Sequence, residues 1–123
     1  MTFRDYPKYN RGMIANGIAH FDVFGPDPEA LHAFYARVFG WEIDVKGPGY
    51  ALVHTPDGAP DGAVVEAERG ALCVGVVVPD LDAAVAAAEA AGGTVVMPPT
   101  DNGWVVKAQV ADPAGNRVSL IAA

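Results

Sequence analysis

Six polar residues that can bind a ligand or carry a proton fall on one predicted face of the strands of this chain. Side chains alternate between the two faces of a strand, and apolar residues such as Phe21 and Val23 occupy the other face. The six are His20, Asp22, Glu66, Cys73, Arg117 and Ser119. In a pocket shielded from water, His20 or Glu66 could act as a general base, and Arg117 could pair with one carboxylate or phenolate. Polar groups gathered on the second face of an apolar sheet favour a ligand cavity.

Apolar and aromatic residues are expected to complete this cavity. Phe24, Val77 and Ile121 share the predicted face, and Tyr50 could stack on a planar ligand or fill the sheet. Trp104 follows a turn signal, so it is either a lid over the cavity or a core residue. His54 ends a strand near a turn and could reach the mouth of the cavity. The mixture predicts a flat, partly aromatic ligand that carries a few oxygen atoms.

A repeat positions these residues. A constant offset of 53 places Cys73 on His20, Asp80 on Asp27 and Gly93 on Gly40. Each half reads as a strand, a helix and three further strands, and such repeats pack side by side because one unit cannot bury its apolar face alone. The pattern predicts an α+β fold of two βαβββ units, at about 17–68 and 71–122, whose curved mixed sheet forms a cavity. They make one domain, 17–123, preceded by an arm at 1–16.

The helices have clear start and stop signals. Asp27 is a good N-cap with Pro28 in the first helical position, and Gly40 is the expected end. An apolar stripe follows the spacing i, i+3, i+4 and i+7 and comprises Leu31, Phe34, Tyr35 and Val38. In the second half Asp80 caps a helix that ends at Gly92, with a stripe of Leu81, Ala84, Val85 and Ala88. His32 lies off the first stripe and is expected to face solvent.

The alignment of the last strand in each half is less constrained. At offset 53 the turn 112–115 meets 59–62, which places Ser119 on Glu66. A second match at offset 57 aligns the same turn with 55–58, and this alternative stays open.

Composition excludes several classes of partner. The chain has 123 residues, 51% of them hydrophobic, and a net charge of −7, with its basic residues scattered singly. Nucleic acid binding requires clustered Lys and Arg, so we expect no nucleic acid partner. No apolar run approaches the roughly 20 residues that span a bilayer, and no signal peptide is evident. A single cysteine fits a reducing compartment, so we expect a cytoplasmic protein without a membrane partner.

Two stretches resemble the vicinal oxygen chelate superfamily, which includes glyoxalase I, fosfomycin and bleomycin resistance proteins and extradiol dioxygenases. The first is His20-Phe-Asp-Val followed by His32-Ala-Phe-Tyr-Ala-Arg-Val-Phe-Gly-Trp41, and the second is Asp112-Pro-Ala-Gly-Asn-Arg-Val-Ser-Leu120. The resemblance covers residues 17 to 122. It implies a homodimer whose cavities each draw on both chains.

The resemblance also implies where a metal would bind. Metal-binding members place ligands on the first, fourth, fifth and eighth strands, which carries over to His20, Glu66, Cys73 and Ser119. This chain has Cys where His is usual and Ser where Glu is usual. Because a serine hydroxyl replaces carboxylate poorly, we expect no cofactor. A divalent metal such as Zn²⁺ held by His20, Glu66 and Cys73 stays open.

Three functions follow. The leading hypothesis is a metal-independent protein that binds an apolar or aromatic metabolite or drug, similar to the sequestering resistance proteins. The second is a metal-dependent lyase, isomerase, transferase or dioxygenase, and the third is a metal-free enzyme that uses His20 or Glu66 as general base. Whether the chain is an enzyme stays open.

Overall fold

The computed structural model describes residues 14–103 and 105–123, which divide into two compact units. The N-terminal unit is His20–Cys73, and the C-terminal unit is Val74–Ala123 together with residues 14–19. Trp104 and residues 1–13, which make up most of the predicted arm, lie outside the described residues. No helix in the described ranges is long and apolar enough to cross a membrane.

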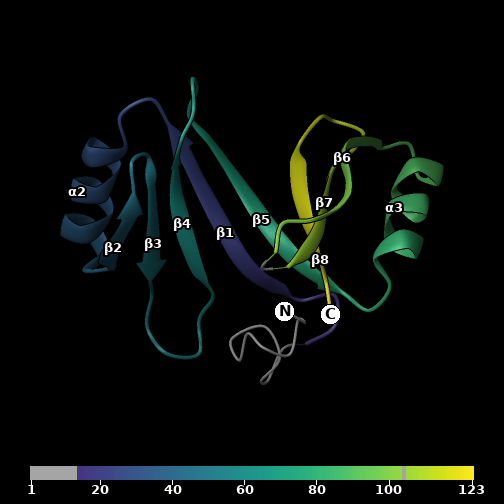
Figure 1. Ribbon diagram of the computed structural model, residues 1–123, viewed down its shortest axis with the longest axis horizontal. Coiled ribbons are helices and arrows are strands. Elements are labelled where there is room, and N and C mark those ends of the chain that lie inside the picture. The colour runs from purple at the N-terminus through teal and green to yellow at the C-terminus, as the bar shows by residue number, and fades with distance from the viewer. Residues whose placement is uncertain (1–13, 104) are drawn as a thin grey trace. The chain divides into compact units, whose positions relative to one another are not determined.

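The N-terminal unit is a four-stranded sheet with one helix. Its elements are β1 (Ile18–Gly25), α2 (Pro28–Phe39), β2 (Glu42–Gly47), β3 (Tyr50–His54) and β4 (Asp61–Glu66). The strand order is β2-β3-β4-β1, in which β1 and β4 are parallel and the other pairs are antiparallel. Figure 1 shows α2 beside this sheet.

The C-terminal unit repeats this topology. Its elements are β5 (Ala71–Val78), α3 (Leu81–Ala90), β6 (Thr94–Asp101), β7 (Val106–Ala111) and β8 (Arg117–Ala122), with strand order β5-β8-β7-β6. Here β5 and β8 are parallel and the other pairs antiparallel (Figure 1). The predicted α+β class, two βαβββ units and mixed strand pairing are therefore confirmed.

The predicted starts of both helices and the predicted end of α2 are confirmed, whereas α3 ends at Ala90, two residues before the predicted Gly92. The Asp27 carboxylate accepts the N–H of Ala30 at 3.2 Å, and Asp80 accepts the N–H of Ala83 at 3.0 Å. α2 ends at Gly40, whose φ of 72° lies in the left-handed region that glycine adopts without strain.

β6 is a strand that contains two prolines, Pro98 and Pro99. Proline lacks the N–H that a central strand must donate, but β6 has a neighbour on one side only in its unit's strand order. Its pairing with β7 shifts register twice, which accommodates the greater length of β6.

The core of the N-terminal unit lies between the sheet and α2. Val23, Val53 and Val64 are buried there, and Leu31 and Tyr35 of α2 pack against them. Only two of the four residues of the predicted stripe pack against this core, because Phe34 and Val38 are 53% and 54% exposed. Trp41 and Ile43 also pack against the core. Trp41 stacks on Tyr35, with ring centroids 5.7 Å apart.

The expectation that His32 faces solvent is wrong. Its side chain is partly buried, and the Nε2 atom is shielded from solvent without a hydrogen-bond partner. The prediction assumed that only the four stripe residues of α2 face the core. The sheet covers a wider part of the helix surface than that stripe, and His32 lies within it.

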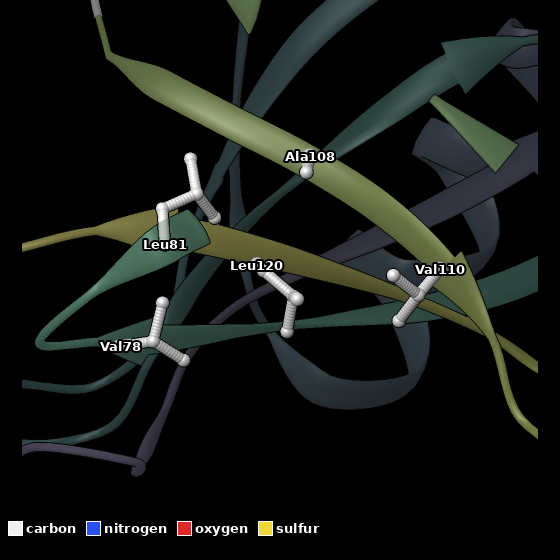
Figure 2. Packing of buried hydrophobic residues seen from close by; sticks show 5 residues of the cluster. All are labelled: Val78, Leu81, Ala108, Val110 and Leu120. Carbon is white, nitrogen blue, oxygen red and sulfur yellow. The ribbon is translucent and has the colours of Figure 1, made fainter. Parts of the chain in front are cut away.

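The core of the C-terminal unit follows the predicted stripe more closely. Leu81 and the small side chains of α3 pack against β5, β7 and β8. Figure 2 shows the five buried residues of this cluster, which are Val78, Leu81, Ala108, Val110 and Leu120.

The two units differ in the register of their parallel strand pairs. Asp22 lies beside Ala63, whereas the equivalent Gly75 lies beside Ser119. Ser119 therefore corresponds to Ala63, at an offset of 56, and Glu66 corresponds to Ala122. Neither the offset of 53 nor that of 57 is the structural one. The structural offset of 56 differs by three residues from the predicted offset of 53. Because side chains alternate along a strand, an odd difference places Glu66 on the opposite face from the predicted one.

We predict that Gly62→Ala destabilises the fold. A Cβ atom at Gly62 would overlap the ring of Phe21, so the substitution should lower the free energy of unfolding by about 1–3 kcal/mol. Gly47→Ala is the matched control, because nothing lies within 4 Å of its Cβ position, and we expect a change within about 0.5 kcal/mol. Urea unfolding of both variants measures this, and equal effects would show that the contact with Phe21 is unimportant.

Candidate functional site

The face of the N-terminal sheet away from α2 gathers most of the predicted site residues. His20, Asp22 and Phe24 alternate with Val23, which points to the helix side, so they share the opposite face. Tyr50 joins them, because Val65 lies beside both Phe24 and Tyr50 in the strand register. Four predicted ligand-binding residues therefore share this surface, called below the N-terminal open face: His20, Asp22, Phe24 and Tyr50.

His20 is held by a carboxylate on this face. Its Nε2 atom lies 3.0 Å from Oδ1 of Asp22, and the two side chains are only 14% and 17% exposed. A partly buried hydrogen bond between a carboxylate and an imidazole fixes the orientation of the ring. The pair can hold a ligand hydroxyl or accept a proton from a bound molecule.

A second imidazole on the same face lies between two aspartates. Nδ1 of His54 is 3.3 Å from Oδ2 of Asp61, and Nε2 is 3.7 Å from Oδ2 of Asp44. The Lys46 ammonium, 2.9 Å from Asp44, is the main cause that lowers the pKa of that carboxyl below its usual value, and His54 adds to it. Asp61 also accepts the N–H of Thr55 at 2.9 Å.

The sequence did not identify Asp61 as a site residue. It was read only as part of the turn that precedes the fourth strand, whereas it is the first residue of β4 and lies beside His20 in the register. Alternation along β4 could have found it, because Asp61 and Ala63 oppose the buried Val64.

Tyr50 has a perturbed pKa. Partial burial raises the pKa of its phenol above 10.0, and the negative charge of Asp22 raises it further. Tyr50 therefore stays neutral near pH 7 and can donate a hydrogen bond from its hydroxyl group.

Glu66 does not belong to the N-terminal open face, so the prediction that it shares a face with His20 is wrong. Its register partner is Gly25, where an added Cβ would meet Leu31 of α2. Glu66 thus lies on the helix side, at the carboxyl ends of β1 and β4. There it lines an open hollow of about 590 Å³ whose other lining residues are Pro26, Pro48, Gly49, Ala67 and Glu68.

The C-terminal unit has its own polar position on the face away from α3. Ser119 is only 7% exposed and lies between Gly75 and Gln109 in the register. Val77 and Ile121 lie on the same face and pack with Ala19. Gln109 was missed, although it alternates with the buried Ala108 and Val110 along β7.

The remaining predicted residues differ in accessibility. Arg117 is exposed at the start of β8, and Cys73 is buried in β5. Trp104, the predicted lid, lies outside the described residues.

The implied metal ligands do not fit a divalent ion. Glu66 lies on the face opposite to His20, and Ser119 offers a hydroxyl in place of a carboxylate. Across residues 14–103 and 105–123, no group of three or more His, Cys, Asp or Glu side chains is close enough to hold a metal ion. Hard divalent ions need several oxygen or imidazole donors at one point. The donor set therefore lacks what such a site requires.

Comparison with family models identifies one family. The family model of the Glyoxalase/Bleomycin resistance protein/Dioxygenase superfamily matches residues 17–120. No curated protein matches the sequence.

Solved structures share the fold at low sequence identity. A Mn(II)-bound glyoxalase from Novosphingobium aromaticivorans is 21% identical with a TM-score of 0.70, over 88% of this chain and 39% of that one. Methylmalonyl-CoA epimerase from Mycobacterium tuberculosis is 14% identical with a TM-score of 0.64, over 90% of both chains. The 2,3-dioxygenase LapB from Pseudomonas sp. KL28 is 19% identical with a TM-score of 0.64, over 93% of this chain and 44% of that one. This chain thus spans about two fifths of the glyoxalase.

We predict that Asp22→Asn lowers the pKa of Tyr50. Removing the carboxylate charge removes the smaller cause of the upward shift, while burial keeps the pKa above 10.0. The tyrosinate absorbance measured against pH, with Tyr50→Phe subtracted, isolates this group. Asp61→Asn is the control, because Asp61 is not among the causes of the shift. An unchanged Tyr50 titration in Asp22→Asn would contradict the arrangement of this face.

Proposed function

The chain belongs to the Glyoxalase/Bleomycin resistance protein/Dioxygenase superfamily, and within it we propose that the chain is a metal-independent small-molecule binding protein. Its ligand is an apolar or aromatic metabolite or drug that lies on the sheet faces away from the helices. The proposal includes a homodimer in the cytoplasm.

The register of β4 is the observation that carries the proposal. It places Ala63, rather than Glu66, at the position that corresponds to Ser119. Because neither Ala63 nor Ser119 supplies a carboxylate, His20 and Cys73 are the strong donors that remain among the residues expected to ligate a metal, and His20 is already engaged by Asp22. One engaged imidazole and one thiol fall short of the three or four donors that a divalent ion requires.

The composition of the N-terminal open face supports the ligand class. Phe24 and Tyr50 offer aromatic surface, while the His20–Asp22 pair and the Tyr50 hydroxyl offer oriented polar groups. Apolar contact supplies most of the affinity in such sites, and the few polar groups set the orientation of the ligand.

A metal-free enzyme is the second candidate, and one contact favours it. The 3.0 Å contact between His20 and Asp22 orients the imidazole as a general base would require. Glu66, the other candidate base, lies on the helix side and is dropped from this role. A metal-dependent enzyme is less well supported, because the donor set of this chain differs from what a divalent ion requires.

We predict that the purified protein contains no stoichiometric metal ion and that His20→Ala weakens ligand binding without unfolding the chain. Elemental analysis before and after dialysis tests the first statement. Calorimetric titration with a panel of aromatic polyketides and glycopeptides, against small phosphates and glutathione adducts, tests the second. Loss of one charge-assisted contact should cost about tenfold or more in affinity.

Glu66→Gln is the matched control, because its side chain lies on the opposite face and its loss should leave affinity unchanged. One Zn, Fe, Mn or Ni per chain that disappears in His20→Ala would overturn the metal-independent proposal. Selective binding of the phosphates or the glutathione adducts would overturn the proposed ligand class.

We also expect tryptophan fluorescence to report binding. If Trp104 borders the ligand, Trp104→Phe removes most of the signal change while Trp41→Phe, which alters the core beside α2, does not. Quenching that survives in Trp104→Phe would exclude the predicted lid.

A further inference from the structure

An Asn-Gly pair lies in the turn between β6 and β7. β6 ends at Asp101 and β7 begins at Val106, and these two residues are register partners, so residues 102–105 close the hairpin. Asn102 and Gly103 are both exposed. The main-chain nitrogen that follows an asparagine can attack the side-chain amide carbon, and glycine hinders this approach least because it has no side chain. A base for the nitrogen and a hydrogen-bond donor for the amide oxygen would both speed the attack.

The attacking nitrogen has a carboxylate beside it. The N–H of Gly103 donates a hydrogen bond to Oδ1 of Asp101 at 2.9 Å. A carboxylate in hydrogen-bond contact with the reacting nitrogen is placed to accept its proton, which is the part of a general base. The residue before the Asn-Gly pair therefore supplies the base.

The amide oxygen of Asn102 has a donor in place. The N–H of Val105 donates to Oδ1 of Asn102 at 3.0 Å, and the main-chain N–H of Asn102 donates in return to the carbonyl of Val105 at 3.3 Å. Negative charge develops on Oδ1 when the nitrogen attacks the amide carbon. A main-chain N–H that is already directed at this oxygen stabilises that charge, as in an oxyanion hole.

We propose that Asn102 is a self-modifying site, which loses ammonia to form a cyclic imide and is then opened by water to aspartate or isoaspartate. The nitrogen of Gly103 forms a bond to Cγ of Asn102, and its proton passes to Asp101. The bond between Cγ and the side-chain nitrogen breaks, and that nitrogen leaves as ammonia with the proton from Asp101. Water then adds to one of the two imide carbonyls and breaks its bond to nitrogen. Opening at the side-chain carbonyl gives aspartate, and opening at the main-chain carbonyl gives isoaspartate.

At the second Asn-Gly pair of the chain, Asn16–Gly17, the attacking nitrogen meets a different partner. Asn16 is exposed, as Asn102 is, so exposure does not distinguish the two pairs. The N–H of Gly17 donates to the main-chain carbonyl of Ile14 at 2.8 Å. A neutral peptide carbonyl is a far weaker base than a carboxylate. The dipeptide alone predicts equal rates, whereas these contacts predict a faster reaction at Asn102.

The reaction changes the hairpin in charge and in length. Both products add one negative charge two residues before Trp104 in the sequence, and isoaspartate also adds one carbon atom to the main chain of the turn. Turn length and strand register depend on each other, so the longer turn strains the pairing of Asp101 with Val106. None of these steps needs the proposed ligand, so the proposal can fail or hold independently of the proposed function.

Peptide mapping of the aged protein tests the proposal. Trypsin places the two pairs on different peptides, 12–37 and 70–107, each of which contains one asparagine and no glutamine. The folded full-length chain is incubated near neutral pH, and a gain of about 1 Da in either peptide reports the conversion, because oxygen replaces NH. An isoaspartyl methyltransferase assay detects the isoaspartate product. Peptide 70–107 should convert at least about tenfold faster than peptide 12–37.

Removal of the base gives a second test. Asp101→Ser keeps a side-chain oxygen that can accept the N–H of Gly103, but a hydroxyl is a poor base, so the conversion of Asn102 should slow at least about tenfold. Asp112→Ser is the matched control, because the Asp112 carboxylate also accepts N–H groups of an exposed turn, those of Ala114 and Asn116. It should leave the rate at Asn102 unchanged. Circular dichroism establishes that each variant is folded.

Unfolding supplies the reference for both tests. In concentrated urea the two pairs should convert at similar rates, because the fold no longer directs the carboxylate and the N–H of Val105 at Asn102. Equal rates in the folded chain, a faster reaction at Asn16, or no reaction at either pair would overturn the proposal. An unchanged rate in Asp101→Ser, or a preference for Asn102 that persists in urea, would overturn it as well.

Discussion

The parallel pairing of β1 with β4 determines which chemical groups of the N-terminal unit can act together. Asp22 lies beside Ala63, and Gly25 lies beside Glu66. Because side chains alternate along both strands, this register directs His20, Asp22 and Asp61 to the face away from α2. The same register directs Glu66 to the helix side. The pairing of β1 with β4 thus accounts both for the environment of the His20–Asp22 pair and for the position of Glu66 on the other face.

The buried valines hold that register in place. Val53 and Val64 are almost wholly enclosed between the sheet and α2, together with Val23. A shift of β4 by one residue would turn Val64 to the open face and direct polar side chains into the core. Each buried polar group left without a partner costs about 1–3 kcal/mol, so the valine core opposes any register that would return Glu66 to His20.

The two faces of the N-terminal sheet therefore differ in chemistry. One carries two imidazoles held by aspartates and a neutral tyrosine, a surface suited to orienting a small molecule. The other carries the core and α2, whose outer side presents Phe34 and Val38 to solvent. In the C-terminal unit, by contrast, all four stripe residues of α3 pack on the sheet.

Local signals in the sequence determined the elements of this protein. The caps at Asp27 and Asp80, the stop at Gly40 and the strand–helix repeat predicted two βαβββ units, because capping and periodicity depend on neighbours a few residues away. They also placed His20 and Asp22 on one face, since both lie on the same strand. Only the tertiary structure decided the register between strands. The register depends on packing between segments some 40 residues apart, here β1 and β4. A single repeat offset also misaligns the strands that follow an insertion in one of the two units. For the same reason the sequence placed Glu66 on the wrong face, overlooked Asp61 and treated Phe34 as buried.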